Sequence, residues 1–115
     1  MTNLIAEGYS IYEARNLVFK RDIEAIVNSD ILIAVLDGRT IDEGVAFELG
    51  YANALGKPCF GLKTDDRTML PSGDNPMIVM ACNNIFSNLS EMIVEIKQTI
   101  EQKAWDRVYP LLRNS

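Results

Sequence analysis

The fold of this chain is decided by residues 29–58, which read SDILIAVLDGRTIDEGVAFELGYANALGKP. A short turn leads into a continuous apolar run, residues 31–36, of the kind that is buried on both faces of a parallel sheet. After a polar loop, Asp42 or Glu43 is placed to start a helix, and Gly56 stands at its C-terminal stop position. A buried strand followed by a loop and a helix predicts a layered α/β fold.

The alternation of helices and strands continues on both sides of this stretch. Apolar residues recur at helical intervals over Ser10–Val27, which predicts a helix there. Downstream we expect a strand at Cys59–Leu62, followed by a long loop at Lys63–Asn75. A short helix at Met77–Ala81 and an edge strand at Ile85–Phe86 come next, and a last helix runs through Ile100. Residues Lys103–Ser115 are expected to form a packed helix or a subunit contact. These elements predict one α/β domain, residues 1–115, with a mostly parallel sheet. Ligands of such sheets sit beyond the carboxyl ends of the strands, where Asp37–Asp42 lies.

The charge and the apolar pattern of the chain exclude several classes of partner. Its 115 residues carry eleven basic and sixteen acidic side chains, a net charge of −5. This balance argues against a nucleic-acid partner, because binding to phosphates requires clustered Lys and Arg. The longest apolar run is far shorter than the roughly 20 residues that span a bilayer, and no basic segment leads into a hydrophobic stretch at the N-terminus. We therefore expect no membrane partner and a cytoplasmic location.

The absence of histidine narrows the chemistry further. It removes Ser-His-Asp and Cys-His catalysis, His-ligated zinc and the usual general base at neutral pH. The two cysteines, Cys59 and Cys82, show no metal-ligand spacing and are interpreted as small buried thiols. We predict no metal site, so any chemistry has to use carboxylates, hydroxyls, amides or the backbone.

Glu48 is the only charged residue in the stretch 44–56. Phe47 and Leu49 flank it, so its carboxylate is expected to be partly desolvated, which is unfavourable unless something compensates. The alternative is a solvated acid on the exposed face of an amphipathic helix. Asp42 also has two interpretations: it caps the helix, or it converges with Glu48 on one ligand, as paired carboxylates do in glycosyl transfer.

The stretch 29–58 resembles the signature of the nucleoside 2-deoxyribosyltransferase family. The resemblance runs from about Asp22 to Met77, and its specific core is the motif D-x-G-x-x-x-E-L-G-Y-A, which starts at Asp42. It implies a flavodoxin-like three-layer fold with a mostly parallel sheet. It also implies a homo-oligomer with shared active sites and no metal or organic cofactor.

The resemblance implies roles for individual residues as well. Glu48 would be the nucleophile, and Asp22, on the preceding helix, matches the acid that faces the base; these two are the predicted catalytic residues. Asp42 would hold a sugar hydroxyl. The predicted substrate-binding residues are Asp37, Asp42, Gly44, Asn75 and Met77. The last two match an N-x-M element that a neighbouring subunit contributes, although by residue type alone they are equally a loop amide and a core side chain.

The activity that the resemblance implies is transfer of a 2-deoxyribosyl group between nucleobases through a covalent glycosyl-Glu48 intermediate. Its partners would be a nucleoside and a free nucleobase. The alternatives are an N-glycoside hydrolase acting on a nucleoside or its 5′-monophosphate, and a non-catalytic nucleotide-binding relative. Asp42 and Glu43, at the start of the helix, would repel a phosphate, which favours a free nucleoside.

The N-terminal part departs from the pattern of the family. The resemblance calls for an earlier strand and helix, with an aromatic residue near the end of that strand. Here residues 3–6 are at most a stub of a strand, and Tyr9 and Tyr12 lie where a helix begins. We expect the first strand to be missing, rearranged or replaced through oligomerisation, which would leave an unpaired sheet edge.

Overall fold

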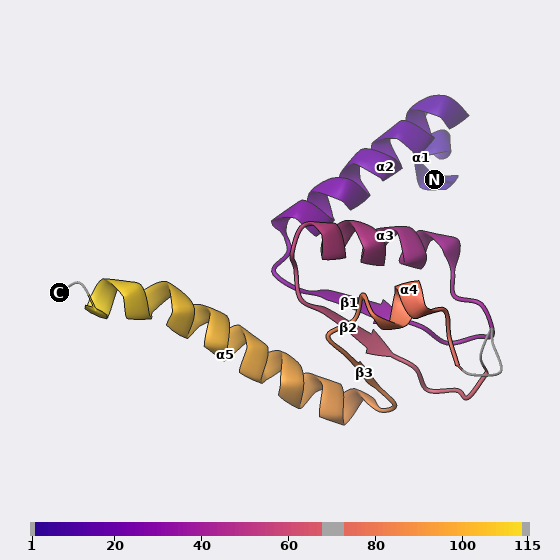
Figure 1. Ribbon diagram of the computed structural model, residues 1–115. Helices are drawn as coiled ribbons and strands as arrows, with labels where there is room; N and C mark the ends of the chain where they lie inside the picture. The colour runs from indigo at the N-terminus through magenta and orange to yellow at the C-terminus, as the bar shows by residue number, and fades with distance from the viewer. Residues whose placement is uncertain (1, 68–72, 114–115) are drawn as a thin grey trace.

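The computed structural model describes residues 2–67 and 73–113, with side chains over 3–67 and 73–106. Helices and strands alternate along the chain (Figure 1). Their bounds are α1 (Thr2–Ala6), α2 (Ile11–Asn28), β1 (Leu32–Val35), α3 (Glu43–Ala54), β2 (Cys59–Leu62), α4 (Pro76–Val79), β3 (Asn84–Phe86) and α5 (Leu89–Arg113). This order confirms the predicted alternation.

The three strands form one parallel sheet in the order β1-β2-β3. Leu32 pairs with Cys59 across β1 and β2, and Phe60 pairs with Asn84 across β2 and β3. Neighbouring strands are joined by crossovers that contain α3 and α4, as parallel strands require. The α/β class and the parallel sheet are thus confirmed, and the loops that follow β1 and β2 leave the sheet at the same edge.

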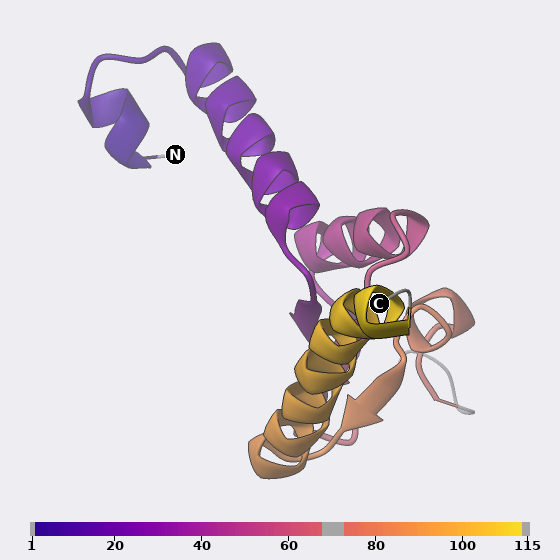
Figure 2. The ribbon, with the colours of Figure 1, turned by 90° about the vertical axis from the view of Figure 1, so that its left-hand side faces the viewer.

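Helices cover both faces of this sheet. α3 and α4 lie on one side and the first part of α5 lies on the other (Figure 2). On the α3 side the buried core consists of Ile26, Leu49, Ala52 and Cys59. Because successive side chains of a strand point to opposite faces, Phe60 lies on the α5 side, where its ring centroid is 6.4 Å from that of Phe86. The layers are therefore helix, sheet and helix.

The start of α3 is fixed by its own sequence. The Asp42 carboxylate accepts hydrogen bonds from the backbone N–H groups of Gly44 at 2.8 Å and Val45 at 3.2 Å. These donors have no partner inside the helix, so Asp42 is its N-cap, as one of the two interpretations predicted. After the helix, Gly56 adopts a φ of +75°, which favours glycine and turns the chain toward β2.

Close packing against β2 requires glycine at position 61. A Cβ atom there would lie 2.7 Å from the Leu36 side chain and 3.1 Å from that of Ile85. The sequence pattern marks this position only as part of an apolar strand.

The N-terminal part differs from the expected stub of a strand. Residues 2–6 form the short helix α1, because no described strand lies beside them to pair with. Within the described chain β1 is accordingly an edge strand, bonded to β2 only. Ile33 and Val35 are 49% and 53% exposed. The expectation that the first strand is missing from its place in the sheet is confirmed for the part of the chain that the structure describes.

The helices at the two ends project from the sheet. α2 rises away from α3, and α5 extends beyond the strands (Figures 1 and 2). The Cα radius of gyration is 17.6 Å, against about 13 Å for a compact domain of this size. The last helix continues past the predicted Ile100 to Arg113, and Trp105 on it is 52% exposed. The side chains of residues 107–115, which the sequence assigned to a packed helix or a subunit contact, lie outside the described part.

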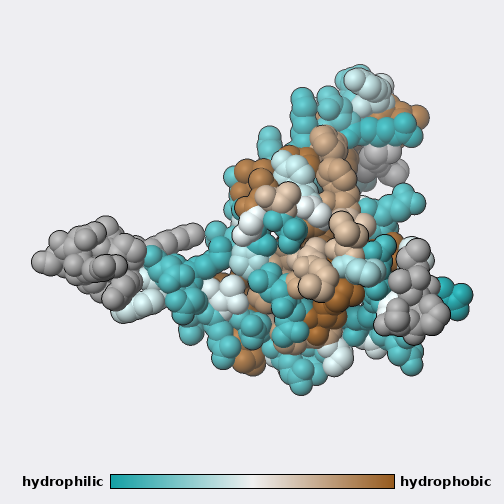
Figure 3. Space-filling model, viewed as in Figure 1, coloured by the Kyte–Doolittle hydropathy of each residue, from teal (hydrophilic) through white to brown (hydrophobic). Residues whose placement is uncertain are grey.

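Apolar side chains also gather on the surface. Figure 3 shows them over α3 and α4, near the centre of that face. Exposed apolar residues in or next to these two helices are Leu55, Met77 and Met80, which are 47%, 79% and 80% exposed. None of the described helices combines the length and the apolar character needed to cross a membrane.

Candidate functional site

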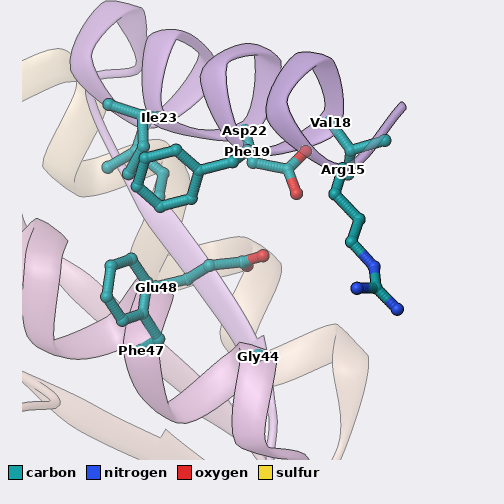
Figure 4. A pocket seen from close by; sticks show the side chains of 9 residues that line it. Arg15, Val18, Phe19, Asp22, Ile23, Gly44, Phe47 and Glu48 are labelled. Atoms are coloured by element: carbon teal, nitrogen blue, oxygen red, sulfur yellow. The ribbon is translucent and has the colours of Figure 1, made fainter. Parts of the chain in front are cut away.

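A pocket of about 330 Å³ lies between α2 and α3 (Figure 4). Its walls are formed by Arg15, Val18, Phe19, Asp22, Ile23 and Ile26 of α2 and by Gly44, Phe47 and Glu48 of α3. The axes of the two helices diverge toward their N-terminal ends (Figure 1). We call the pocket that their side chains line the wedge, and the side toward these N-terminal ends its open side. Its volume lies within the range of small-molecule sites.

The pocket brings together the two predicted catalytic residues, Asp22 and Glu48. Figure 4 shows both carboxylates pointing toward the open side of the wedge. The same two residues also line a smaller depression of about 180 Å³ that continues down to Leu32 of β1. Glu48 is half-buried, whereas Asp22 is exposed. Within the described chain neither carboxylate has a hydrogen bond or an ion pair, so both are open to a ligand.

Aromatic rings form one wall of this pocket. The ring centroids of Phe19 and Phe47 are 6.3 Å apart, and those of Phe47 and Tyr51 are 6.2 Å apart with nearly parallel planes. Phe19 and Phe47 remain 56% and 54% exposed, so their surfaces are accessible. A flat heterocycle stacks favourably on such rings.

Gly44 lines the pocket, and Asp42 lies two residues before it as the N-cap of α3. One oxygen of Asp42 accepts both capping hydrogen bonds, and the other oxygen has no described partner. Six residues separate Asp42 from Glu48, about 9 Å along the helix axis. The capping role therefore leaves Asp42 with one free oxygen at the end of the wedge.

Asp37 is held by the loop after β2. Its carboxylate accepts hydrogen bonds from the Thr64 backbone N–H and, at 2.7 Å, from the Thr64 hydroxyl. These two bonds lower the pKa of Asp37 below its ordinary value. Asp37 is not among the residues that form the Glu48 pocket, so the structure places it in a contact between two loops.

Lys63, which the sequence did not single out, is the centre of this contact. Its ammonium donates hydrogen bonds to the carbonyl oxygens of Leu36 and Gly38, both at 3.1 Å. It also forms ion pairs with Asp65 at 3.2 Å and Asp74 at 3.4 Å. The side chains of Lys63 and Asp74 are only 12% and 10% exposed. The Lys63 ammonium thus links the loop between β1 and α3 to the segment that leads into α4.

Asp65 holds the same loop through a second set of hydrogen bonds. Its Oδ2 atom accepts from the Arg67 guanidinium at 2.7 Å and from the Gly38 backbone N–H at 2.9 Å. The hydrogen bond from Arg67 is the main cause that lowers the pKa of Asp65 to about 2, with smaller contributions from Gly38 and Lys63. The backbone of the loop after β1 is therefore held by Asp65, which accepts from its N–H group, and by Lys63, which donates to its carbonyl groups.

Asn75 and Met77 lie away from the Glu48 pocket. Asn75 caps α4 by accepting a hydrogen bond from the Met77 N–H at 2.9 Å, and Met77 itself is 79% exposed. Asn75 lines a different pocket, of about 260 Å³, on the side of α3 that carries Glu43 and Ala46. Within one chain the structure does not bring Asn75 and Met77 together with Glu48.

The two cysteines take no part in either pocket. Cys59 is fully buried and Cys82 is half-buried. Burial raises the pKa of both thiols, that of Cys82 to about 11, so both are protonated at neutral pH. Among the described residues no group of His, Cys, Asp and Glu is arranged to hold a metal ion.

Comparison with known proteins adds one finding. The family model described as nucleoside 2-deoxyribosyltransferase matches residues 3–103, which include both helices of the wedge and all three strands. No curated protein matches the chain.

Proposed function

Because the chain belongs to the nucleoside 2-deoxyribosyltransferase family, we propose that it transfers a 2-deoxyribosyl group between nucleobases through a covalent intermediate on Glu48. The observation that carries this proposal is the wedge between α2 and α3. It presents two carboxylates, without described partners, beside an aromatic wall in a pocket of about 330 Å³. A nucleoside offers both a flat base for the wall and an electrophilic carbon for a carboxylate.

In the proposed reaction the Glu48 carboxylate attacks C1′ of the sugar while the C1′–N bond breaks, and the bonding electrons leave with the base. The departing base must be protonated. We assign Asp22, which lies across the wedge from Glu48, to hold the base while it takes up the proton. The absence of a 2′-hydroxyl eases the step, because no electron-withdrawing group adjoins the cationic centre. A second base then attacks C1′ from the face that the first base left. The C1′–O bond to Glu48 breaks, its electrons restore the carboxylate, and the incoming base gives up its N–H proton.

The proposed sugar site extends from Glu48 toward the start of α3. The free oxygen of Asp42 is assigned to a sugar hydroxyl, and Gly44 keeps this end of the wedge open because it has no side chain. The charges of Asp42 and Glu43 disfavour a phosphate at the N-terminus of α3, so we assign a free nucleoside as the substrate.

The proposed active site is shared between copies of the chain. Asn75 lines a pocket on another face of α3, and Met77 next to it is exposed, so both are assigned to the site of a neighbouring subunit. The exposed Met77 and Met80 and the projecting helices support a homo-oligomer, since a stable monomer rarely exposes such apolar surface.

The test is exchange of a nucleobase. Purified protein mixed with deoxyinosine and adenine should produce deoxyadenosine, detected by liquid chromatography. Glu48→Gln should abolish this product, whereas Glu24→Gln, an exposed acid elsewhere on α2, should retain it. Mass spectrometry after reaction with a slow 2-fluoro analogue should find the sugar on Glu48.

Three results would contradict the proposal. Retained exchange in Glu48→Gln would remove Glu48 from the mechanism. Release of hypoxanthine without transfer would identify a hydrolase. Nucleoside binding without any turnover would identify a non-catalytic relative.

A further inference from the structure

Among the described residues that line the Glu48 pocket, Arg15 is the only basic one. Its guanidinium makes no hydrogen bond or ion pair with any described residue, although two carboxylates line the same pocket. An unpaired guanidinium at the edge of an apolar pocket offers several N–H donors to whatever enters.

The spacing along α2 explains why Arg15 shares the pocket. Arg15, Phe19 and Asp22 follow at intervals of four and three residues, so they lie on one face of the helix. Figure 4 shows the Arg15 guanidinium and the Asp22 carboxylate directed to the same open side. Seven residues correspond to about 10 Å along the axis, a span that the long Arg15 side chain helps to cross. A base that meets Asp22 can therefore also meet Arg15.

We propose that Arg15 selects nucleobases that present a ring carbonyl over their amino counterparts. This inference rests on the proposed function, because it places the base in the wedge. Arginine is donor-only and always charged, and its fork matches acceptors such as O6 and N7 of a 6-oxopurine. Adenine has an amino group where hypoxanthine has its carbonyl oxygen. The N–H donors of that amino group would face the N–H donors of the Arg15 guanidinium, with no acceptor between them.

A 5′-phosphate offers the same acceptor chemistry to an arginine. The base carbonyl is the better match here, because Arg15 lies on the same helix face as Asp22 and the stacking ring of Phe19, and all three line the pocket. The experiment separates the two sources.

The test compares matched substrates. For the full-length protein, kcat/KM should be higher for deoxyinosine than for deoxyadenosine, and higher for deoxyuridine than for deoxycytidine. Arg15→Met should reduce the purine ratio on the order of 10-fold, the discrimination that one good bidentate contact provides, and the pyrimidine ratio by less, because uracil offers the fork only its O4 acceptor. Arg15→Lys should give intermediate ratios, because it keeps the charge and loses the fork. Arg21→Met, an exposed arginine on the same helix that does not line the pocket, should leave the ratios unchanged.

The outcomes distinguish this inference from the proposed function. Exchange with unchanged ratios in Arg15→Met would overturn the role of Arg15 and leave the transferase intact. If the protein exchanges no base at all, the transferase fails, and calorimetry with free hypoxanthine and adenine decides the role of Arg15. Tighter binding of hypoxanthine than of adenine, lost in Arg15→Met, would support the role of Arg15 in base selection. Equal affinities of the unchanged protein for the two bases would overturn that role. Faster turnover of deoxyinosine 5′-monophosphate than of deoxyinosine, lost in Arg15→Met, would assign the guanidinium to a phosphate and overturn the base assignment.

Discussion

Replacing Lys63 by methionine tests how the two loops beside the sheet are held together. Methionine keeps most of the apolar stem and removes the ammonium. The hydrogen bonds to Leu36 O and Gly38 O, both 3.1 Å long, are lost, and each bond to a charged donor contributes about 1.5–3 kcal/mol. The carboxylate of Asp74, which is 10% exposed, loses its counter-ion, a situation that costs about 3–5 kcal/mol when fully buried.

These contributions are not additive, because they share one group. Asp65 keeps its bonds from Arg67 and Gly38, and water can enter once the ammonium is gone. We therefore expect the free energy of unfolding to fall by about 3 kcal/mol, a large part of the roughly 5–15 kcal/mol that stabilises a typical domain.

The assay is urea unfolding followed by circular dichroism. The midpoint should fall while the slope stays unchanged, which identifies a loss of stability rather than a change of the unfolded state. Lys97→Met, an exposed lysine on α5, is the matched control and should change stability by less than about 0.5 kcal/mol. A Lys63→Met protein as stable as that control would refute the reasoning that this ammonium holds the loops.

Two further predictions concern acid stability and packing. The folded pKa of Asp65 is about 2, below its ordinary value of 3.8, so its ionised form adds stability above about pH 4, and this stability is lost as the pH falls toward 2. Asp65→Asn should flatten this part of a plot of urea midpoint against pH, and a curve parallel to that of the natural protein would contradict the assignment. Gly61→Ala should destabilise the fold by about 1–3 kcal/mol, because its methyl group would lie 2.7 Å from the Leu36 side chain. A Gly61→Ala protein with the same melting temperature as the natural protein would contradict this prediction, because it would show that the Leu36 and Ile85 side chains move aside without loss of stability.

The elements that the sequence predicted well are those whose signals are local. The apolar run that forms β1, the cap at Asp42 and the glycine at 56 depend on neighbouring residues, and all three have the expected place. Residues 3–6 were expected to form at most a stub of a strand, and they are helical. A strand requires a partner that is distant in sequence, whereas one helical turn closes its own hydrogen bonds.

The candidate site was only partly visible in the sequence. Glu48 stood out because it is the only charged residue between positions 44 and 56, but Arg15 and Phe19 join it through the crossing of α2 over α3, which no local pattern encodes. The spacing of Arg15, Phe19 and Asp22 could have indicated their association, because intervals of four and three residues put these side chains on one helix face. Lys63 acts through partners up to 27 residues away, so its role follows only from the pairing of β1 with β2.

The two faces of α3 explain why the predicted residues of the site separate into two groups. Gly44, Phe47 and Glu48 face the wedge, whereas Glu43 and Ala46 face the pocket of Asn75. Neither of the pockets that Glu48 lines also includes Asn75. The role proposed for Asn75 at the sugar or base therefore requires a second copy of the chain that brings its own Asn75 to Glu48.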